Sequence, residues 1–293
     1  MAPRDLALAA VTSVIWGLAF VATKLALDGF SPTQLAALRF IVAALPILVL
    51  PRPRVPWVML AAIGLSLFAG QFILLFFAYA HGLPPGLASV TQQMQVFFTV
   101  PLAAVVLRDV PTSRQSLGMT IAFCGLVLIG FTMGGDLTFA ALGLALAAAF
   151  SWAIGNVLVM ITGPVAMVPL MAWASLVVPL PALALSAILD TDANMVTAIA
   201  GASWLAIASA IYLGTLSTNI AYAAWSHLLT RYPAALVAPF ALLVPCTGVV
   251  ASALIFHETF SPIRYLGMAL ILTGVATVVL PLEWLRCRRD PKR

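Results

Sequence analysis

Three glutamines stand close together in the stretch SVTQQMQVFFTVP, residues 89–101. An amide both donates and accepts hydrogen bonds, so a cluster of amides can hold a small polar ligand without a fixed charge. On a helix, Ala88, Gln92, Gln95 and Thr99 fall within about 60° of one another and form a stripe about 16 Å long. Gln93 points about 100° away from that stripe, and we expect it to bond a neighbouring helix.

Other polar and aromatic side chains recur at helical spacing. Trp152 and Asn156 lie four residues apart, on one face of a helix, and Asn219 and Tyr222 belong to a second stripe within residues 215–226. Aromatic rings suit planar apolar groups or cations, and amides with a histidine suit the amino and carboxylate groups of an amino acid. We expect a small-molecule site that includes Trp16, Tyr79, His81, Gln92, Gln95, Trp152, Asn156, Asn219 and Tyr222.

The elements that must position these residues are membrane-spanning helices. Of the 293 residues, 63% are hydrophobic and 8% are charged, whereas a soluble domain carries about 25% charged residues. Apolar runs recur from end to end, each long enough to cross a hydrocarbon core about 30 Å thick. These runs are continuous rather than alternating, which excludes a β-barrel. The sequence predicts an all-α integral membrane protein, whose polar stripes must face protein or water rather than lipid.

Breaks at charged residues, proline and glycine divide the chain into ten expected spans: 5–27, 33–50, 57–80, 86–107, 114–132, 137–160, 167–189, 202–227, 234–256 and 262–283. An even number places both termini on one side. Arginine gathers in the segments on that side, so the positive-inside rule predicts cytoplasmic termini and a multi-pass protein of the cell inner membrane. Trp16 and Trp152 lie about 15 Å into their spans, too deep for interfacial anchors.

The chain also contains an internal repeat. Residues 107–130 lie over residues 256–279 at a constant offset, and the run LGM occurs at the same place in both copies. Each half holds five spans, an odd number, so the second half enters the membrane from the opposite side. Inverted repeats are typical of secondary transporters, which bind substrate where the halves meet. We expect three parts: a first repeat at 1–133, a second, inverted repeat at 134–285 and a basic cytoplasmic tail at 286–293.

In both halves, an acidic residue follows a proline-containing helix and is itself followed by the LGM run and a glycine. This pattern resembles the EamA repeat of the drug/metabolite transporter superfamily. The pairs Trp16-Gly17 and Arg39-Phe40 resemble that family's pattern as well. In the eighth span, the segment from Asn219 to Trp225 is similar to the matching helix of YddG-type aromatic amino-acid exporters. The resemblance covers nearly the whole chain. It implies a ten-helix fold, alternating access and export of small metabolites.

We therefore expect an exporter of small metabolites, chiefly amino acids and aromatic ones among them. No Asp or Glu stands in the middle of an expected span, and proton-driven transporters generally need an ionisable group there. Export is thus expected to be facilitated, without obligatory proton coupling. The alternative is efflux of aromatic or cationic drugs, with proton coupling allowed, through the same aromatic cavity.

An enzyme, a channel and a nucleic-acid partner are not expected, and neither is a cofactor or a metal. The three cysteines lack metal-ligand spacing, and the HExxH motif fails because Ser261 stands where the second histidine is needed. The basic residues of the tail indicate topology rather than binding of nucleic acid. The expected partners are an amino-acid substrate and the lipid bilayer, and the expected state is a monomer.

Prolines and glycines mark where helices bend or pack closely. Pro101, Pro239 and Pro245 are hinge candidates, since each frees a carbonyl within a span. Small residues at Gly118 and Gly125, and again at Gly267 and Gly274, favour close helix contact. Arg39 lies about 9–12 Å into the second span. We expect it to reach outward to the interface or to bond backbone carbonyls rather than to bind substrate.

Overall fold

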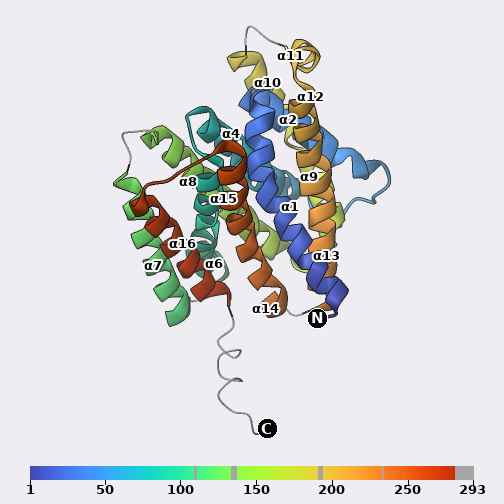
Figure 1. Ribbon diagram of the computed structural model, residues 1–293. Coiled ribbons are helices and arrows are strands. Elements are labelled where there is room, and N and C mark those ends of the chain that lie inside the picture. Colours follow the sequence, from blue (N-terminus) through green and yellow to red (C-terminus); the bar gives the residue numbers. More distant parts are fainter. Residues whose placement is uncertain (109–110, 133–136, 191–193, 233, 281–293) are drawn as a thin grey trace.

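The computed structural model describes residues 1–108, 111–132, 137–190, 194–232 and 234–280. The predicted tail at 286–293 lies outside these ranges. Every regular element in the described part of the chain is a helix (Figure 1), which confirms the all-α prediction. Within it, nine helices are long and apolar enough to cross a membrane, and Pro32–Leu48 is a shorter apolar helix. Together they coincide with the ten expected spans.

The helical pieces of the first half are α1 (Pro3–Leu27), α2 (Pro32–Ala44), η1 (Leu45–Leu48), α3 (Trp57–Ile63), η2 (Gly64–Gly70), α4 (Gln71–Ala80), α5 (Pro85–Thr91), α6 (Met94–Leu107) and α7 (Ser113–Gly130). Those of the second half are α8 (Phe139–Thr162), α9 (Met167–Ser175), α10 (Pro179–Leu189), α11 (Met195–Gly201), α12 (Trp204–Tyr212), η3 (Leu213–Ile220), α13 (Ala221–Arg231), α14 (Ala234–Val237), η4 (Ala238–Leu242), α15 (Leu243–Phe256) and α16 (Pro262–Val279).

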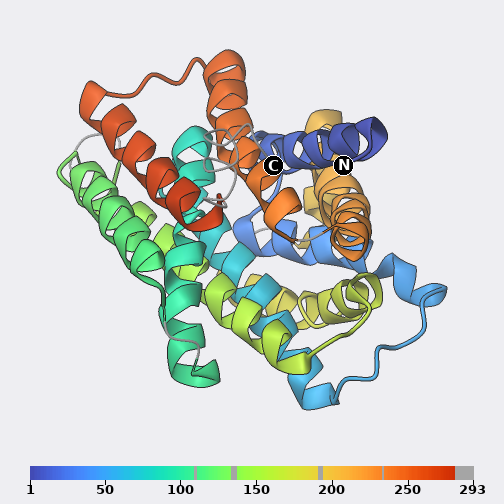
Figure 2. The same cartoon turned by 90° about the horizontal axis from the view of Figure 1, so that it is seen from below.

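The helices form one bundle in which segments far apart in the sequence lie side by side. α1 packs against α15, α12 and α13, and α8 packs against α4 and α6. α7 and α16 lie together at one edge, as Figure 2 shows from below. α1 begins and α16 ends at the same end of the bundle (Figure 1). Elements from both halves therefore surround the centre.

The two halves share their pattern of helices. α6 and α15 each have 14 residues, and each ends at a residue in the left-handed conformation, Arg108 with φ 57° and His257 with φ 54°. α7 and α16 have 18 residues each, and both follow a hydroxyl N-cap. Each half also contains a π-helical stretch, η2 and η3. The repeat in the sequence is thus accompanied by a repeat in local structure.

Glycine permits the contact between α7 and α16. A Cβ atom on Gly125 would lie 2.5 Å from the carbonyl oxygen of Gly267, and one on Gly274 would lie 2.5 Å from that of Gly118. These distances are too short for a carbon, and the obstacles are backbone atoms that cannot turn away. The predicted close contact is confirmed, and it brings the two backbones together without side chains between them.

We predict that Gly125→Ala destabilises the protein by about 1–3 kcal/mol, the range for overpacking a filled interface. The added methyl group meets the backbone of α16, which must move. Gly143→Ala is the matched control, because nothing lies within 4 Å of a Cβ at that position. The control should keep or raise stability, since alanine is favoured over glycine in a helix by about 1 kcal/mol. Thermal unfolding in detergent measures both, and equal melting temperatures for the two variants would contradict the assignment.

Candidate substrate site

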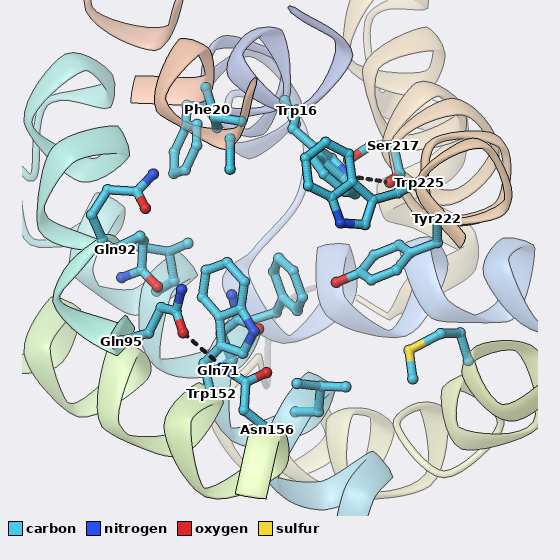
Figure 3. Close-up of a pocket in the computed structure, with 18 of the residues that line it drawn as sticks. Trp16, Phe20, Gln71, Gln92, Gln95, Trp152, Asn156, Ser217, Tyr222 and Trp225 are labelled. Carbon is cyan, nitrogen blue, oxygen red and sulfur yellow. Dashed lines mark hydrogen bonds between the residues drawn. The ribbon is translucent and has the colours of Figure 1, made fainter. Parts of the chain in front are cut away.

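A cavity of about 320 Å³ lies among the helices, and both halves of the chain line it. Figure 3 shows the amides of Gln92, Gln95 and Asn156 on one side of it, with the indole of Trp152 beside them, and the rings of Trp16, Trp225 and Tyr222 on the other. Its lining residues are Trp16, Ala19, Phe20, Thr23, Arg39, Leu67, Gln71, Phe72, Leu75, Gln92, Gln93, Gln95, Trp152, Asn156, Val159, Met167, Met171, Ser217, Tyr222, Trp225, Ala241 and Val244.

The amide side of the cavity is held by hydrogen bonds between helices. Asn156 on α8 donates from Nδ2 to Gln95 Oε1 at 2.7 Å and to Thr99 Oγ1 at 3.3 Å (Figure 3). Gln92 donates from Nε2 to the carbonyl of Ala145 at 3.0 Å. Both glutamines are therefore positioned by α8, and the predicted stripe does face the protein interior.

The helix is interrupted where the glutamines stand. α5 ends at Thr91 and α6 begins at Met94. Between them the bonding switches to three-residue steps: Gln93 N–H donates to the carbonyl of Val90 at 3.0 Å, and Gln95 N–H to that of Gln92 at 3.2 Å. Because the tighter winding changes the angle per residue, Gln93 also lines the cavity. This differs from the expectation that it points toward a neighbouring helix.

The aromatic side of the cavity is built around Trp16. Its ring centre lies 5.4 Å from that of Tyr222 and 5.2 Å from that of Trp225. The indole Nε1–H donates to the carbonyl of Ser217 at 2.9 Å. Ser217 belongs to the π-helical stretch η3, where the altered bonding leaves carbonyls available to side chains. The rings are therefore fixed in place by a local irregularity of the backbone.

Arg39 enters the lining from α2 and is 4% exposed. Its guanidinium carbon lies 3.9 Å from the ring centre of Phe72 and 5.4 Å from that of Phe40. It also donates a hydrogen bond to Thr218 Oγ1 at 3.3 Å. The expectation that Arg39 reaches out to the interface was wrong. Aromatic faces inside the bundle attract the cation, so the side chain stays in the interior.

The cavity brings together six of the nine predicted site residues: Trp16, Gln92, Gln95, Trp152, Asn156 and Tyr222. Tyr79, His81 and Asn219 are not among its lining residues. Tyr79 is 2% exposed and donates to the carbonyl of Phe20 at 3.1 Å. His81 is exposed, follows the end of α4, and its Nδ1 lies 2.8 Å from the carbonyl of Phe77.

Sequence reasoning missed several lining residues, above all Phe20, Gln71 and Phe72. Gln71 did carry a signal, because it is an isolated amide in an apolar span. It stands where η2 ends and α4 begins. Phenylalanines give no such signal, since a ring that faces a ligand and a ring in the core look alike in the sequence.

The end of the cavity away from Met1 is closed by tight packing between helices. All seven residues of α5 are buried. Ser89 Oγ donates to the carbonyl of Pro245 at 3.3 Å, and a Cβ on Gly248 would lie 2.5 Å from Ser89 Cβ. α1 approaches α15 as closely, because a Cβ on Gly17 would lie 2.5 Å from Thr247 Cβ. α5, α15 and α1 thus seal this end.

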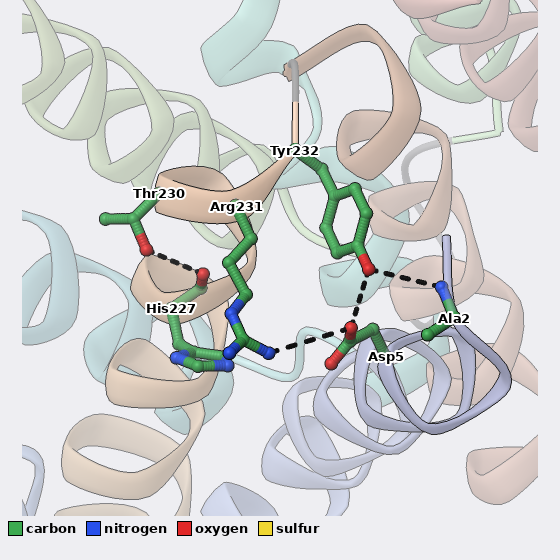
Figure 4. A network of polar contacts seen from close by, with 6 residues as sticks. All are labelled: Ala2, Asp5, His227, Thr230, Arg231 and Tyr232. Carbon is green, nitrogen blue, oxygen red and sulfur yellow. Dashed lines mark hydrogen bonds and ion pairs between the residues drawn. The ribbon is translucent and has the colours of Figure 1, made fainter.

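At the opposite end, a polar network ties the start of α1 to the end of α13 (Figure 4). Tyr232 O–H donates to Asp5 Oδ2 at 2.7 Å and accepts a bond from the N–H of Ala2 at 3.2 Å. Arg231 lies 4.0 Å from the same carboxylate. α1 and α13 both carry the aromatic side of the cavity. The network therefore joins parts of one wall and does not reach α6 or α8.

The predicted hinge prolines occupy different settings. Pro101 lies inside α6, and Pro239 stands at the start of the 3-10 helix η4. Pro245 lies inside α15, is buried, and its carbonyl accepts the bond from Ser89. Pro239 therefore lies within η4, and Pro245 follows η4 in the first turn of α15. Movement at these prolines stays a prediction.

Glu258 joins the closed end from the segment between α15 and α16. Its Oε2 accepts a hydrogen bond from the N–H of Gly86 at 3.2 Å and another from Ser252 Oγ. Burial raises the pKa of this carboxyl, and the bonds from Ser252 and Gly86 and the charge of Lys24 offset the rise in part. The packed state therefore favours the protonated form more than water does.

The sequence profile of the EamA-like transporter family matches residues 5–131 and 139–280. A protein of Escherichia coli K12 named "Probable amino-acid metabolite efflux pump" is 39% identical, with 97% of each chain covered. A "Probable terminal-alkyne amino-acid exporter" of Streptantibioticus cattleyicolor is 29% identical over 92% of this chain and 91% of its own. One solved crystal structure, 17% identical, superposes with a TM-score of 0.64 over 99% of this chain and 100% of that one.

We predict that Glu258→Gln raises the melting temperature at pH 7 to 8. A carboxyl whose pKa is raised on folding destabilises the folded state when it is ionised. The amide resembles the protonated acid and does not pay this penalty. The advantage should shrink as the pH falls through the raised pKa toward the ordinary value of 4.5, because the wild-type carboxyl then becomes protonated. Thermal unfolding across this range is the measurement, and a difference independent of pH would contradict it.

Asp190→Asn is a control of opposite sign. Burial acts to raise the pKa of Asp190, but hydrogen bonds donated by Thr33, Ser31 and Ser186 outweigh it, and the pKa is lowered. Its ionised form therefore stabilises the fold above the ordinary value of 3.8, and the contribution is lost as the pH falls below it. The asparagine variant should melt lower than the wild type at pH 7.

Proposed function

We propose that this chain, which belongs to the EamA-like transporter family, exports amino acids across the cell inner membrane. The supporting observation is the cavity of about 320 Å³, lined by amides and aromatic rings from both halves. Sites for small ligands are commonly of this size and combine apolar walls with a few polar groups. The relatives named as amino-acid efflux pumps and exporters point to the same substrate class.

Transport proceeds by alternating access between two inverted repeats, 1–133 and 134–285. The repeated helix bounds and the shared left-handed residues after α6 and α15 support this division. The positive-inside rule puts both termini in the cytoplasm. The end sealed by α5, α15 and α1 then faces outward, and the described conformation faces the cytoplasm. An exporter accepts its substrate in this conformation.

Export is facilitated, without obligatory proton coupling. Among the described residues, none of those lining the cavity is Asp, Glu or His. A proton-coupled carrier generally needs an ionisable group that takes up a proton within the membrane, and the one charged group here is an arginine, which stays protonated. The protein acts as a monomer and has no enzymatic activity, cofactor or nucleic-acid partner.

The rival proposal is efflux of aromatic or cationic drugs through the same rings. The guanidinium of Arg39 lines the cavity, and a fixed positive charge repels a permanent cation in a space of low dielectric constant. This charge favours substrates that carry a carboxylate. We therefore retain amino acids as the substrate class.

We predict that the purified protein in proteoliposomes catalyses counterflow of labelled amino acids. The variants Gln95→Ala, Trp152→Ala and Tyr222→Ala should each lower it by about tenfold, which corresponds to a loss of about 1.4 kcal/mol. Trp204→Ala is the control, because that tryptophan is 78% exposed at the start of α12 and should leave counterflow unchanged. Absence of counterflow with every amino acid tested would refute the proposed function.

We also predict that flux at a constant substrate gradient is insensitive to an imposed pH gradient. No lining group of the described cavity titrates at physiological pH, so the cavity offers no group to which a proton must bind during transport. Flux of labelled substrate into proteoliposomes is measured with and without a pH difference. A steep response would overturn facilitated export while leaving the substrate class intact.

A further inference from the structure

Two buried polar atoms of the cavity residues have no hydrogen-bond partner in the described part of the chain: Arg39 Nε and Gln92 Oε1. The residues are 4% and 1% exposed, and both line the cavity. Leaving a buried donor or acceptor unpaired costs about 1–3 kcal/mol, and more for a charged group. One terminal nitrogen of Arg39 donates to Thr218, and Gln92 Nε2 donates to Ala145, so Arg39 Nε and Gln92 Oε1 are available to a ligand.

Within the described ranges, Arg39 lacks a counter-charge as well as a hydrogen-bond partner for Nε. Among the described residues, the structure contains one ion pair, between Arg231 and Asp5, at one end of the bundle. Around the guanidinium stand two phenylalanine rings and the hydroxyl of Thr218, which are neutral. A cation enclosed in a membrane protein is expensive unless it is paired. A carboxylate would supply the charge and could accept two parallel N–H bonds from the guanidinium.

Gln92 presents the opposite chemistry. Its Nε2 is occupied by the carbonyl of Ala145, which orients the amide and leaves Oε1 as a pure acceptor. Such an atom takes an N–H donor. An ammonium group fits, since it has three donors and no acceptor, as in lysine. The indole rings of Trp16 and Trp152, which also line the cavity, can face a cation or an apolar side chain.

We propose that Arg39 binds the carboxylate of an amino-acid substrate and that Gln92 Oε1 accepts a hydrogen bond from its ammonium group. The inference rests on the proposed function and sharpens it. The two groups common to all amino acids are bound by Arg39 and Gln92, while the aromatic rings contact the variable side chain. Recognition of this kind requires a free carboxylate and tolerates several side chains.

The experiment compares acids with their methyl esters, which keep the ammonium group and lose the carboxylate. The six compounds are alanine, leucine, phenylalanine and their methyl esters. Each is tested as a competitor of counterflow in proteoliposomes and for the shift it causes in the melting temperature of the purified protein. We expect the acids to compete at least about tenfold better with the wild type, the ratio for one hydrogen bond to a charged group. Arg39→Gln should reduce the ratio to about twofold or less, and Arg39→Lys should retain part of it.

Arg264→Gln is the matched control. Arg264 is 5% exposed and bonds Thr132, through Nε to Oγ1 at 2.9 Å and through a terminal nitrogen to the carbonyl at 3.1 Å. It is a buried arginine outside the cavity lining, so its loss should lower stability and keep the acid-to-ester ratio. If Arg39→Gln does not fold, the wild-type ratio and Arg39→Lys decide the question.

The outcomes separate this inference from the proposed function. Counterflow with equal preference for acids and esters in the wild type overturns the role of Arg39 and leaves amino-acid export standing. An unchanged ratio in Arg39→Gln does the same. If none of the three acids is transported, while the wider panel of amino acids also fails, both proposals fall together.

The role of Gln92 is tested with a second pair of ligands. 3-Phenylpropionate is phenylalanine without its amino group, and the wild type should prefer phenylalanine by about tenfold. Gln92→Met removes the acceptor and should reduce that preference, whereas Gln92→Glu keeps the shape, adds a negative charge and should increase it. A preference that is the same in all three proteins would overturn this half of the inference.

Discussion

The structure depends on one constraint: inside a bilayer, a polar group must find its partner within the protein or in an enclosed cavity. Irregular backbone is therefore tolerated where it is buried in the protein or lines such a cavity. The break between α5 and α6, the 3-10 turn η4 and the π-helical stretches η2 and η3 all contribute residues to the cavity lining. The same constraint gathers the amides on one side of the cavity, where Asn156 pairs with Gln95. The cavity and the irregular helices are two results of one requirement.

Similar backbones carry different side chains in the two halves, and this difference gives the cavity its polarity. Gln92 and Gln95 stand beside the break in the first half, whereas Ala241 and Val244 line the cavity beside the corresponding break in the second. Trp16 and Trp152, by contrast, stand at corresponding positions, where both halves carry a tryptophan. The cavity therefore has an amide side and an aromatic side within a nearly symmetric frame. A substrate with distinct polar and apolar ends would bind there in a single orientation.

The sequence predicted the spans and much of the cavity, because hydropathy and helical spacing depend on local chemistry alone. It predicted six lining residues, Gln95 and Trp152 among them. The prediction failed where the backbone departs from a regular helix, or where the direction of a side chain depends on a partner distant in the sequence. Gln93 faces the cavity because the chain tightens at that point, and Arg39 stays inside because the ring of Phe72, on another helix, attracts it. The hydroxyl of Tyr79 donates a hydrogen bond to the carbonyl of Phe20, a contact that no pattern within its own span could indicate.

Alternating access requires two arrangements of similar free energy, and the contacts at the closed end suit that requirement. Ser89 and Glu258 each bond backbone groups across the seal, and a hydrogen bond of this kind contributes about 1 kcal/mol net because water can replace the partner. A ligand can shift such an equilibrium by binding one arrangement better than the other. The glycine contact between α7 and α16 differs, since two backbones meet there and water has no room to replace either. These two helices should therefore move as one body while the contacts of α5 open and close.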